Sequence, residues 1–281
     1  MEPDLHGRVV LITGATSGIG KEAARQLSAR GATVVMGARD PTRGKQVKDE
    51  TASAEGPEVQ LIMADLSVPD QVRGLAREFE KRFERLDILI NNAGVDVGRR
   101  VTTDGGLELT FAVNYLAPFL LTTSLLDLLR ASAPAGVVNV VSGGHRGGRI
   151  DFDDLQHEHR FTGQRAYNDS KLALVAFTYE LARSLPANQV TANCFDPGFV
   201  RGTNIGKTLP GGYQVMGVVF TPFMSTVAKA AHGLVQAATD PALASVTGAY
   251  FKGGKQVASS KESQDPELAR RLWESAEALT G

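Results

Sequence analysis

The sequence predicts an α/β fold, a doubly wound parallel sheet of seven strands with helices on both faces. From Arg8 onward, short runs rich in β-branched residues alternate with longer stretches of helical period, as in successive βαβ units. Residues 9–12 and 137–141 are almost continuously apolar, which is typical of strands covered on both faces. Neither a composition shift nor an internal repeat divides the 281 residues, so residues 1–281 are expected to form one domain.

The same pattern gives the positions of seven strands and six helices. The segment 116–129 is the most apolar, but Asp127, Pro118 and its short length argue against a membrane span and favour a buried or subunit-contacting helix. We expect strands at 9–13, 33–37, 59–63, 88–91, 137–142, 190–195 and 248–251, and helices at 18–30, 70–83, 104–131, 166–185, 226–239 and 266–279.

Composition and charge exclude several classes of protein. Hydrophobic residues make up 42% and charged residues 22%, as in a soluble globular protein. A formal charge of −1 provides no bulk field that would draw the chain to nucleic acid or to an anionic membrane. Cys194 is the only cysteine, so we expect neither a disulfide nor a metal site. The first residues show no targeting pattern, which predicts a cytoplasmic protein without a membrane anchor.

A glycine-rich turn follows the first strand and precedes a good helix-forming segment that starts at Lys21. Glycine leaves no Cβ between the backbone and a ligand, so a pyrophosphate can approach the amides at the positive end of the helix. Its position favours a dinucleotide site, although any turn between a strand and a helix also favours glycine. The residues expected to bind the cofactor here are Gly14, Thr16, Ser17, Gly18, Ile19 and Gly20.

The end of the second strand predicts which ribose is bound. An acidic residue there accepts hydrogen bonds from a free 2′-hydroxyl, whereas an arginine suits a 2′-phosphate. This chain has Ala38 followed by Arg39, whose planar guanidinium matches phosphate oxygens. We therefore expect NADP(H) to be preferred, with NAD(H) as the alternative if Asp40 turns toward the ribose. Arg43 could reinforce a phosphate contact, but a solvated surface charge is the simpler interpretation.

A tyrosine and a lysine four residues apart, Tyr167 and Lys171, share one face of a predicted helix. Tyrosine titrates near 10, and an opposite charge at about 4–6 Å shifts an acid by roughly 1–3 units. Lys171 alone would therefore bring Tyr167 only part of the way to neutrality, and an oxidised nicotinamide ring would supply a second positive charge. Such a pair is also common as a purely structural feature.

Several short motifs occur along the chain in a fixed order. They are the turn at 13–20, Asp65-Leu66, Asn91-Asn92-Ala93-Gly94, Asn114, Ser142, Tyr167 with Lys171, and Pro197-Gly198. In this order and spacing the chain resembles the classical short-chain dehydrogenase/reductase family along essentially its whole length. Segments 111–122, 148–152 and 269–274 resemble the retinol dehydrogenase branch. The resemblance implies a Rossmann-type, NAD(P)-binding domain.

The resemblance implies roles for four catalytic residues. Tyr167 would be the acid in carbonyl reduction and the base in alcohol oxidation, while Lys171 would hold the nicotinamide ribose and lower the pKa of Tyr167. Ser142 would donate a hydrogen bond to the substrate oxygen and stabilise charge as it develops. Asn114 would belong to a proton relay behind Lys171, through an ordered water.

The resemblance also implies contacts to the adenine half of the cofactor. Asp65 would accept a hydrogen bond from the adenine amino group, and Leu66 would lie beside the ring. Without the resemblance, Asp65 would be interpreted as a helix cap. Asn92, Ala93 and Gly94 would support the adenine side and the centre of the sheet.

At the nicotinamide end, Pro197, Gly198 and Val200 would cover the ring. Gly202 stands where the family pattern places a threonine, so Thr203 is the candidate for the carboxamide contact although it comes one position late. Asp196 also departs from the histidine that is usual before this proline in the retinol dehydrogenase branch, and the sequence assigns it no role.

Two segments are expected near the substrate, at 143–166 and 204–225. In the second, Met216, Val218, Val219 and Phe220 favour a lipophilic substrate, although a lid that packs on its own protein or on a neighbouring subunit fits them equally well. The histidines of the first segment are expected to be mainly solvated. The family usually forms dimers or tetramers through the helices on either side of the fifth strand, which implies a homodimer or homotetramer.

Together these features predict an oxidoreductase that transfers hydride between NADP(H) and a carbonyl or alcohol carbon of a lipophilic small molecule, working as a ketone or aldehyde reductase. Two alternatives stay open. One is an enzyme of the same fold that carries out a dehydration or isomerisation, and the other is a cofactor-binding regulator without chemistry.

Overall fold

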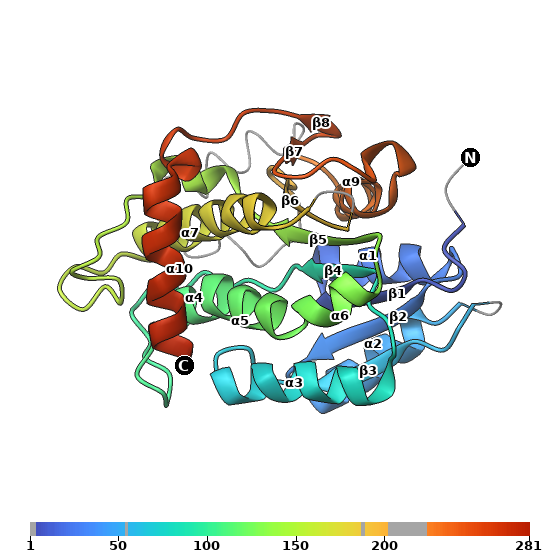
Figure 1. Cartoon of the computed structure of the whole chain (residues 1–281). Helices are drawn as coiled ribbons and strands as arrows, with labels where there is room; N and C mark the ends of the chain where they lie inside the picture. Colours follow the sequence, from blue (N-terminus) through green and yellow to red (C-terminus); the bar gives the residue numbers. More distant parts are fainter. Residues whose placement is uncertain (1–3, 54–55, 187–188, 202–223) are drawn as a thin grey trace.

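The computed structural model describes residues 4–53, 56–186, 189–201 and 224–281, and these form one sheet between two layers of helices (Figure 1). The strand order is β3-β2-β1-β4-β5-β6-β7-β8, so successive strands are added on one side of β1 up to β3 and on its other side from β4 onward, as in a doubly wound fold. The strands are β1 Val9–Thr13, β2 Thr33–Ala38, β3 Gln60–Met63, β4 Ile88–Asn91, β5 Ala135–Val140, β6 Val190–Asp196, β7 Tyr250–Lys252 and β8 Lys255–Gln256.

The predicted fold class is correct, but the prediction of seven strands missed β8. Strands β1 to β7 pair in parallel, and β8 then returns antiparallel to β7. The two residues of the turn, Gly253 and Gly254, have φ values of +58° and +75°. A glycine pair between short runs is the signal of a two-residue hairpin, and the sequence contained it.

Alternation along the central strands divides the core between the two faces of the sheet. Val9 and Leu11 belong to one hydrophobic cluster, whereas Val10 and Ile12 belong to the other. Helices α3 Pro69–Arg82, α5 Ala117–Ser124 and α7 Gly163–Ser184 pack on the first face, with α10 Pro266–Thr280 outside them, and α1 Gly18–Ser28, α2 Pro41–Thr51 and α9 Val227–Thr239 pack on the second.

The helix expected at 104–131 begins later and is interrupted. Glu108 caps its start by accepting hydrogen bonds from the amides of Thr110 and Phe111. Pro118 has no amide hydrogen for the α-helical ladder, and the turn before it is a π-helix in which the amide of Ala117 donates to Ala112. The segments are α4 Leu109–Phe111, η1 Ala112–Leu116, α5 and α6 Leu126–Ala131.

Helix α2 was not predicted, because Val47 is its only large apolar residue and no helical period is visible. The sequence does contain a signal for the start of this helix, an aspartate followed by a proline. Asp40 accepts a hydrogen bond from the amide of Arg43, and Pro41 occupies the first turn. The other expected helices lie close to their predicted positions, and the short 3-10 turns are η2 Gly143–Gly147, η4 Pro241–Leu243 and η5 Glu262–Gln264.

Helix α10 crosses the outer side of α5 and α7 (Figure 1). The indole of Trp273 packs edge-on against Phe119, with ring centroids 5.0 Å apart, and 5.6 Å from Phe177. The hydroxyl of Tyr115 donates to the carbonyl of Leu272 at 2.8 Å. The apolar side chains of the 116–129 stretch are therefore covered within the chain, and assembly into a homodimer or homotetramer stays a prediction. No helix in the described ranges combines the length and apolarity needed to cross a bilayer.

Candidate active site

The sequence motifs converge at one edge of the sheet, where the parallel strands end. Thr13, Asn91 and Asp196 are the last residues of β1, β4 and β6, and Val140 ends β5. Open α/β sheets bind ligands at this edge, near the point where the strand order reverses. Helix α7 runs beside it and carries Tyr167 and Lys171.

The glycine turn between β1 and α1 fits a pyrophosphate. Ser17 caps α1 without a side-chain hydrogen bond, so the first amides of the helix remain available to a ligand. Gly18 has φ +54°, and a Cβ built there would meet nothing within 4 Å. Gly20 is tightly enclosed, because a Cβ there would lie 2.3 Å from the side-chain nitrogen of Asn92.

Asn92 holds this turn in place, a role that the sequence analysis had not given it. Its side-chain nitrogen donates to the carbonyls of Thr13 at 2.9 Å and Gly14 at 3.1 Å. The Thr13 hydroxyl in turn accepts from the amides of Asn92 and Ala93, each at 3.1 Å. These bonds tie the ends of β1 and β4 together beneath the cofactor cradle.

Two arginines flank the place expected for the adenine ribose. The Arg39 side chain is 73% exposed, with a guanidinium nitrogen 4.0 Å from a carboxylate oxygen of Asp65. Arg43 is not a free surface charge, because its Nε donates to the carbonyl of Thr16 at 3.0 Å. Asp40 is engaged in capping α2. The structure therefore brings Arg43 to the glycine turn, which agrees with the alternative in which Arg43 reinforces a phosphate contact.

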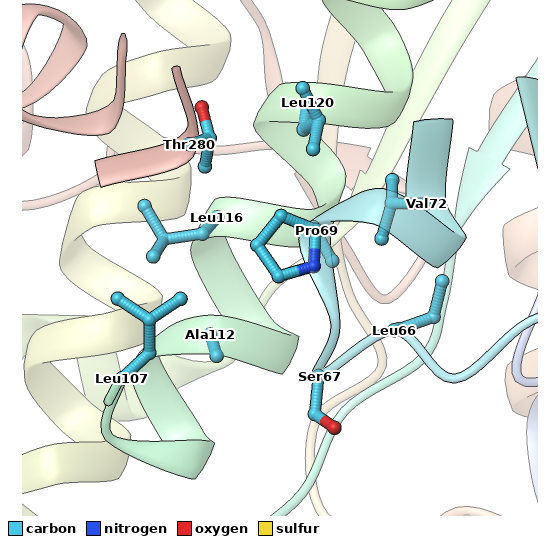
Figure 2. A pocket seen from close by; sticks show the side chains of 10 residues that line it. Leu66, Ser67, Pro69, Val72, Leu107, Ala112, Leu116, Leu120 and Thr280 are labelled. Carbon is cyan, nitrogen blue, oxygen red and sulfur yellow. The ribbon is translucent and has the colours of Figure 1, made fainter. Parts of the chain in front are cut away.

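Asp65 and Leu66 lie in the loop between β3 and α3. One oxygen of Asp65 accepts from the amide and hydroxyl of Ser67, at 2.9 and 2.7 Å, so this residue stabilises a local turn and does not cap α3. Figure 2 shows Leu66, Ser67 and Pro69 on one side of a small apolar cavity, opposite Leu116 and Thr280. The cavity has room for about one water molecule, which makes it a packing defect beside the site and no substrate pocket.

The Ser142 hydroxyl and the Tyr167 ring both lie beside Gly144, where an added Cβ would be 3.5 Å from Ser142 Oγ and 3.4 Å from Tyr167 Cε1. Ser142 follows β5, and its hydroxyl accepts from the amide of Gly144 at 3.2 Å. A hydrogen bond to Ser142 lowers the pKa of Tyr167, but burial acts more strongly in the opposite direction, with smaller effects from Asp96 and Asp196, and raises it to about 12. Burial therefore outweighs the hydrogen bond, and the pKa of Tyr167 lies above its ordinary value. A lowering of this pKa by Lys171 stays a prediction.

Lys171 is buried, and its Nζ lies 5.8 Å from the centre of the Tyr167 ring. The ammonium donates to the carbonyl of Val140 at 2.9 Å. Burial lowers the pKa of Lys171 to about 8, while the carboxylate of Asp196 acts in the opposite direction.

Asn114 lies in the π-helical turn, which directs its side chain toward β4. Its nitrogen donates to the carbonyl of Val95 at 2.9 Å and its oxygen accepts from the amide of the same residue at 2.8 Å. A Cβ built on Gly94 would lie 3.4 Å from the Asn114 oxygen and 3.6 Å from the Lys171 Nζ. The space between Asn114 and Lys171 is therefore bounded by Gly94.

Asp196, which had no assigned role, begins the segment expected over the nicotinamide. Its carboxylate accepts from the amide of Gly198 at 2.9 Å and from the hydroxyl of Tyr250 at 2.9 Å. Phe199 is 81% exposed, and Val200 forms a bridge with Ser225. Gly202 and Thr203 lie outside the described residues, as do Met216, Val218, Val219 and Phe220 and nearly all of the 204–225 segment.

The expectation that the loop histidines are mainly solvated is wrong for two of them. His145 and His157 are buried, and His159 is exposed. His157 lies 3.6 Å from a carboxylate oxygen of Asp169, and His145 bonds to the carbonyl of Ser142 and accepts from the amide of Ser260. Their burial could not be inferred from local sequence, because each is covered by residues distant along the chain.

A family model for short chain dehydrogenases matches residues 8–213. The chain belongs to this family. Among its relatives, mouse retinol dehydrogenase 13 is 39% identical over 98% of this chain and 84% of its own. A protein of Streptomyces sp. strain C5 with the provisional name daunorubicin C-13 ketoreductase DnrU is 39% identical over 99% of this chain and 94% of its own.

These relatives place this short chain dehydrogenase in the retinol dehydrogenase-like branch, as the sequence motifs predicted. A solved structure of a blue fluorescent protein from a metagenomic library, in complex with NADPH, has a TM-score of 0.70 and 28% identity. The match covers 90% of this chain and 99% of that protein. Members of the family act as oxidoreductases with nicotinamide cofactors, and this chain is a hydride-transferring oxidoreductase of alcohol or carbonyl groups.

Proposed function

We propose that this short chain dehydrogenase transfers hydride between NADP(H) and a carbonyl or alcohol carbon of a lipophilic small molecule, working as a ketone or aldehyde reductase. One observation carries the proposal. The Ser142 hydroxyl and the Tyr167 ring lie together beside Gly144 at the carboxyl edge of the sheet, with the Lys171 ammonium 5.8 Å from the centre of that ring. An acid, a hydrogen-bond donor and a cation therefore face the same small space.

The bound nicotinamide would supply or receive the hydride. Tyr167 would donate its phenolic proton to the substrate oxygen, and its high pKa keeps that proton in place until the charge develops. Ser142 would donate a hydrogen bond to the same oxygen. Lys171 would hold the ribose hydroxyls and stabilise the phenolate left after transfer, and Asn114 would belong to the relay that returns a proton through an ordered water.

The preference for NADP(H) is supported by the two arginines at the glycine turn. Arg39 is exposed and adjacent to Asp65, and Arg43 is held at the carbonyl of Thr16. Both guanidinium groups can approach a 2′-phosphate at the end of β2. Asp40 favours this proposal indirectly, because capping α2 occupies the carboxylate that NAD(H) would require.

A lipophilic substrate is supported by the exposed aromatic ring of Phe199 on the segment over the nicotinamide. The names of the two relatives refer to retinol, an apolar alcohol, and to reduction of a ketone of daunorubicin. Residues 1–281 would form a single domain whose segments 143–166 and 204–225 lie beside this substrate, and the protein would act in the cytoplasm as a homodimer or homotetramer.

The test is oxidation of NADPH in the presence of a lipophilic aldehyde, retinaldehyde, or a lipophilic ketone, daunorubicin. We expect turnover by the wild type, loss of turnover in Tyr167→Phe by about 10²–10⁴-fold, and an unchanged Kd for NADPH in that variant. Tyr115→Phe is the matched control, because it also removes a buried hydroxyl but lies against α10. NADPH binding without reduction of either carbonyl would favour a non-redox enzyme or a regulator, and turnover by Tyr167→Phe would remove Tyr167 as the acid.

A further inference from the structure

A buried polar cluster lies directly behind the Ser142 loop and takes no part in the proposed chemistry. It consists of His145 from η2, Asp196 at the end of β6, Tyr250 from β7 and Ser260 from the segment before α10. All four residues are buried, and the exposed fraction of Asp196 is only 1%. Burying a carboxylate and an imidazole is unfavourable unless their hydrogen bonds are satisfied, so their partners reveal what the cluster holds.

The two ring nitrogens of His145 face opposite kinds of partner. Nδ1 lies 2.7 Å from the carbonyl of Ser142, which can only accept a hydrogen bond. Nε2 lies 3.1 Å from the amide of Ser260, which can only donate. The ring must therefore be neutral, with its hydrogen on Nδ1. Burial, the larger effect, lowers the pKa of His145 and favours the same neutral form.

The other half of the cluster reaches the segment over the nicotinamide. The Tyr250 ring centroid lies 5.0 Å from that of His145, and its hydroxyl donates to the Asp196 carboxylate at 2.9 Å. The second carboxylate oxygen of Asp196 accepts from the Gly198 amide at 2.9 Å, and Lys252 forms an ion pair with Asp196 at 3.1 Å. Ser142 and Gly198 are thus both tied to β7 and the chain that follows it.

We propose that His145 and Asp196 are positioning residues, His145 for the Ser142 hydroxyl and Asp196 for the nicotinamide-covering segment at Gly198, with Tyr250 joining the two. The inference rests on the proposed function, because it assigns these residues to the same reaction. Neither side chain needs to touch the substrate. Each fixes the backbone of a residue that does, and a misplacement of about 1 Å at a reacting group can cost about 10²-fold in rate.

The segment 257–264 takes part in the same arrangement. The Tyr179 hydroxyl on α7 donates to the Ser259 hydroxyl at 2.7 Å, and the Ser263 hydroxyl donates to that of Ser259 at 2.8 Å. Ser260 itself accepts from the amide of Ser263 at its hydroxyl, at 3.3 Å, which helps to fix its own amide as the donor for His145. This segment connects the active-site loop with α10, which is far from it along the chain.

The first experiment separates His145 from Asp196 by steady-state kinetics with NADPH and the carbonyl substrate. In His145→Ala we expect kcat to fall about 10–100-fold while the Kd for NADPH changes less than twofold. His145→Asn, whose side-chain amide can place an N–H near the Nδ1 position, should recover a substantial part of the loss. His159→Ala is the control, because His159 is an exposed histidine of the same loop.

For Asp196 we expect the opposite result, a weaker affinity for NADPH with a smaller effect on kcat. Asp196→Ala should raise the Kd for NADPH about tenfold, because the Gly198 amide loses its acceptor. Asp196→Asn keeps an acceptor oxygen and should raise the Kd by less than about threefold. Thermal unfolding of each variant shows that it is folded. If His145→Ala and Asp196→Ala fold and keep both kcat and NADPH affinity, or if the conservative variants recover nothing, the inference is wrong.

A third measurement needs no activity. In protein labelled with ¹⁵N-histidine, the ring nitrogens of His145, assigned by comparison with His145→Asn, should report a neutral ring protonated on Nδ1 at pH 7. Protonation on Nε2 or on both nitrogens would overturn the inference. Failure of the proposed function would be recognised separately, because the wild type itself would then oxidise no NADPH with either carbonyl.

Discussion

The ammonium of Lys171 donates a hydrogen bond to the carbonyl of Val140, at 2.9 Å. Strand β5 thereby fixes the cation on which the proposed chemistry depends, and Lys171 makes this contact from inside the protein, where it is 2% exposed. The strand that ends at Val140 also leads into Ser142, so one strand end positions two of the four proposed catalytic residues.

This burial predicts the pH dependence of the reaction. The pKa of Lys171 is lowered to about 8, so the side chain is charged below pH 8 and loses its proton above it. The kcat/KM for NADPH at saturating carbonyl should therefore fall as the pH rises through about 8, while Tyr167 remains protonated up to about 12. Asp196 raises the Lys171 pKa, so Asp196→Asn should move the inflection to lower pH. A flat profile between pH 7 and 10 would contradict this assignment.

Arg39, which follows β2, is expected to determine the choice between NADPH and NADH. Arg39→Ala should weaken NADPH binding by about 1.5–3 kcal/mol, the range for a hydrogen bond to a charged group, and leave NADH binding nearly unchanged. Titration calorimetry with both cofactors measures the two losses. Arg130→Ala, which removes an exposed arginine paired with Asp127, is the control. Equal losses of NADPH and NADH would show that Arg39 does not recognise the 2′-phosphate.

The cradle makes a steric prediction. In Gly20→Ala the new Cβ would lie 2.3 Å from the Asn92 side chain and 2.5 Å from the Gly14 carbonyl oxygen, so the turn must open and NADPH binding should be lost. Gly74→Ala is the matched control, because a Cβ on that α3 residue meets nothing. It should stabilise the protein by about 0.5–1 kcal/mol. Fluorescence titration measures the NADPH affinity, and urea unfolding measures the stability. An unchanged NADPH affinity in Gly20→Ala would show that the close packing of Gly20 is not needed for cofactor binding.

The position of α10 predicts the effect of a core substitution distant from the site. Trp273→Ala removes the contacts with Phe119 and Phe177 and should lower the free energy of unfolding by about 3 kcal/mol, as expected for the loss of a large packed aromatic. Glu274→Ala, on the exposed side of the same helix, should change it by less than about 0.5 kcal/mol. Light scattering on both variants shows whether uncovering the α5 and α7 face raises the molar mass. An unchanged unfolding midpoint in Trp273→Ala would mean that these rings do not hold α10.

The sequence by itself determined the sheet, the glycine cradle and the pairing of Tyr167 with Lys171. These features depend on residues that are close along the chain. The pattern of apolar residues predicts the strands, and a glycine-rich turn after a strand predicts the cradle. Two residues four positions apart share one face of a helix. Helix α2 and strand β8 were missed although their local signals, Asp40-Pro41 and Gly253-Gly254, were present.

Only the tertiary structure decided the roles of His145, Asp196 and Arg43 and the covering of α5 and α7 by α10. His145 is bonded to a residue 115 positions later, and Asp196 to one 54 positions later. The pKa values of Tyr167 and Lys171 likewise follow from how deeply the fold buries them. Burial and long-range hydrogen bonds arise from segments that meet only after folding, and no local pattern of residues specifies which segments those are.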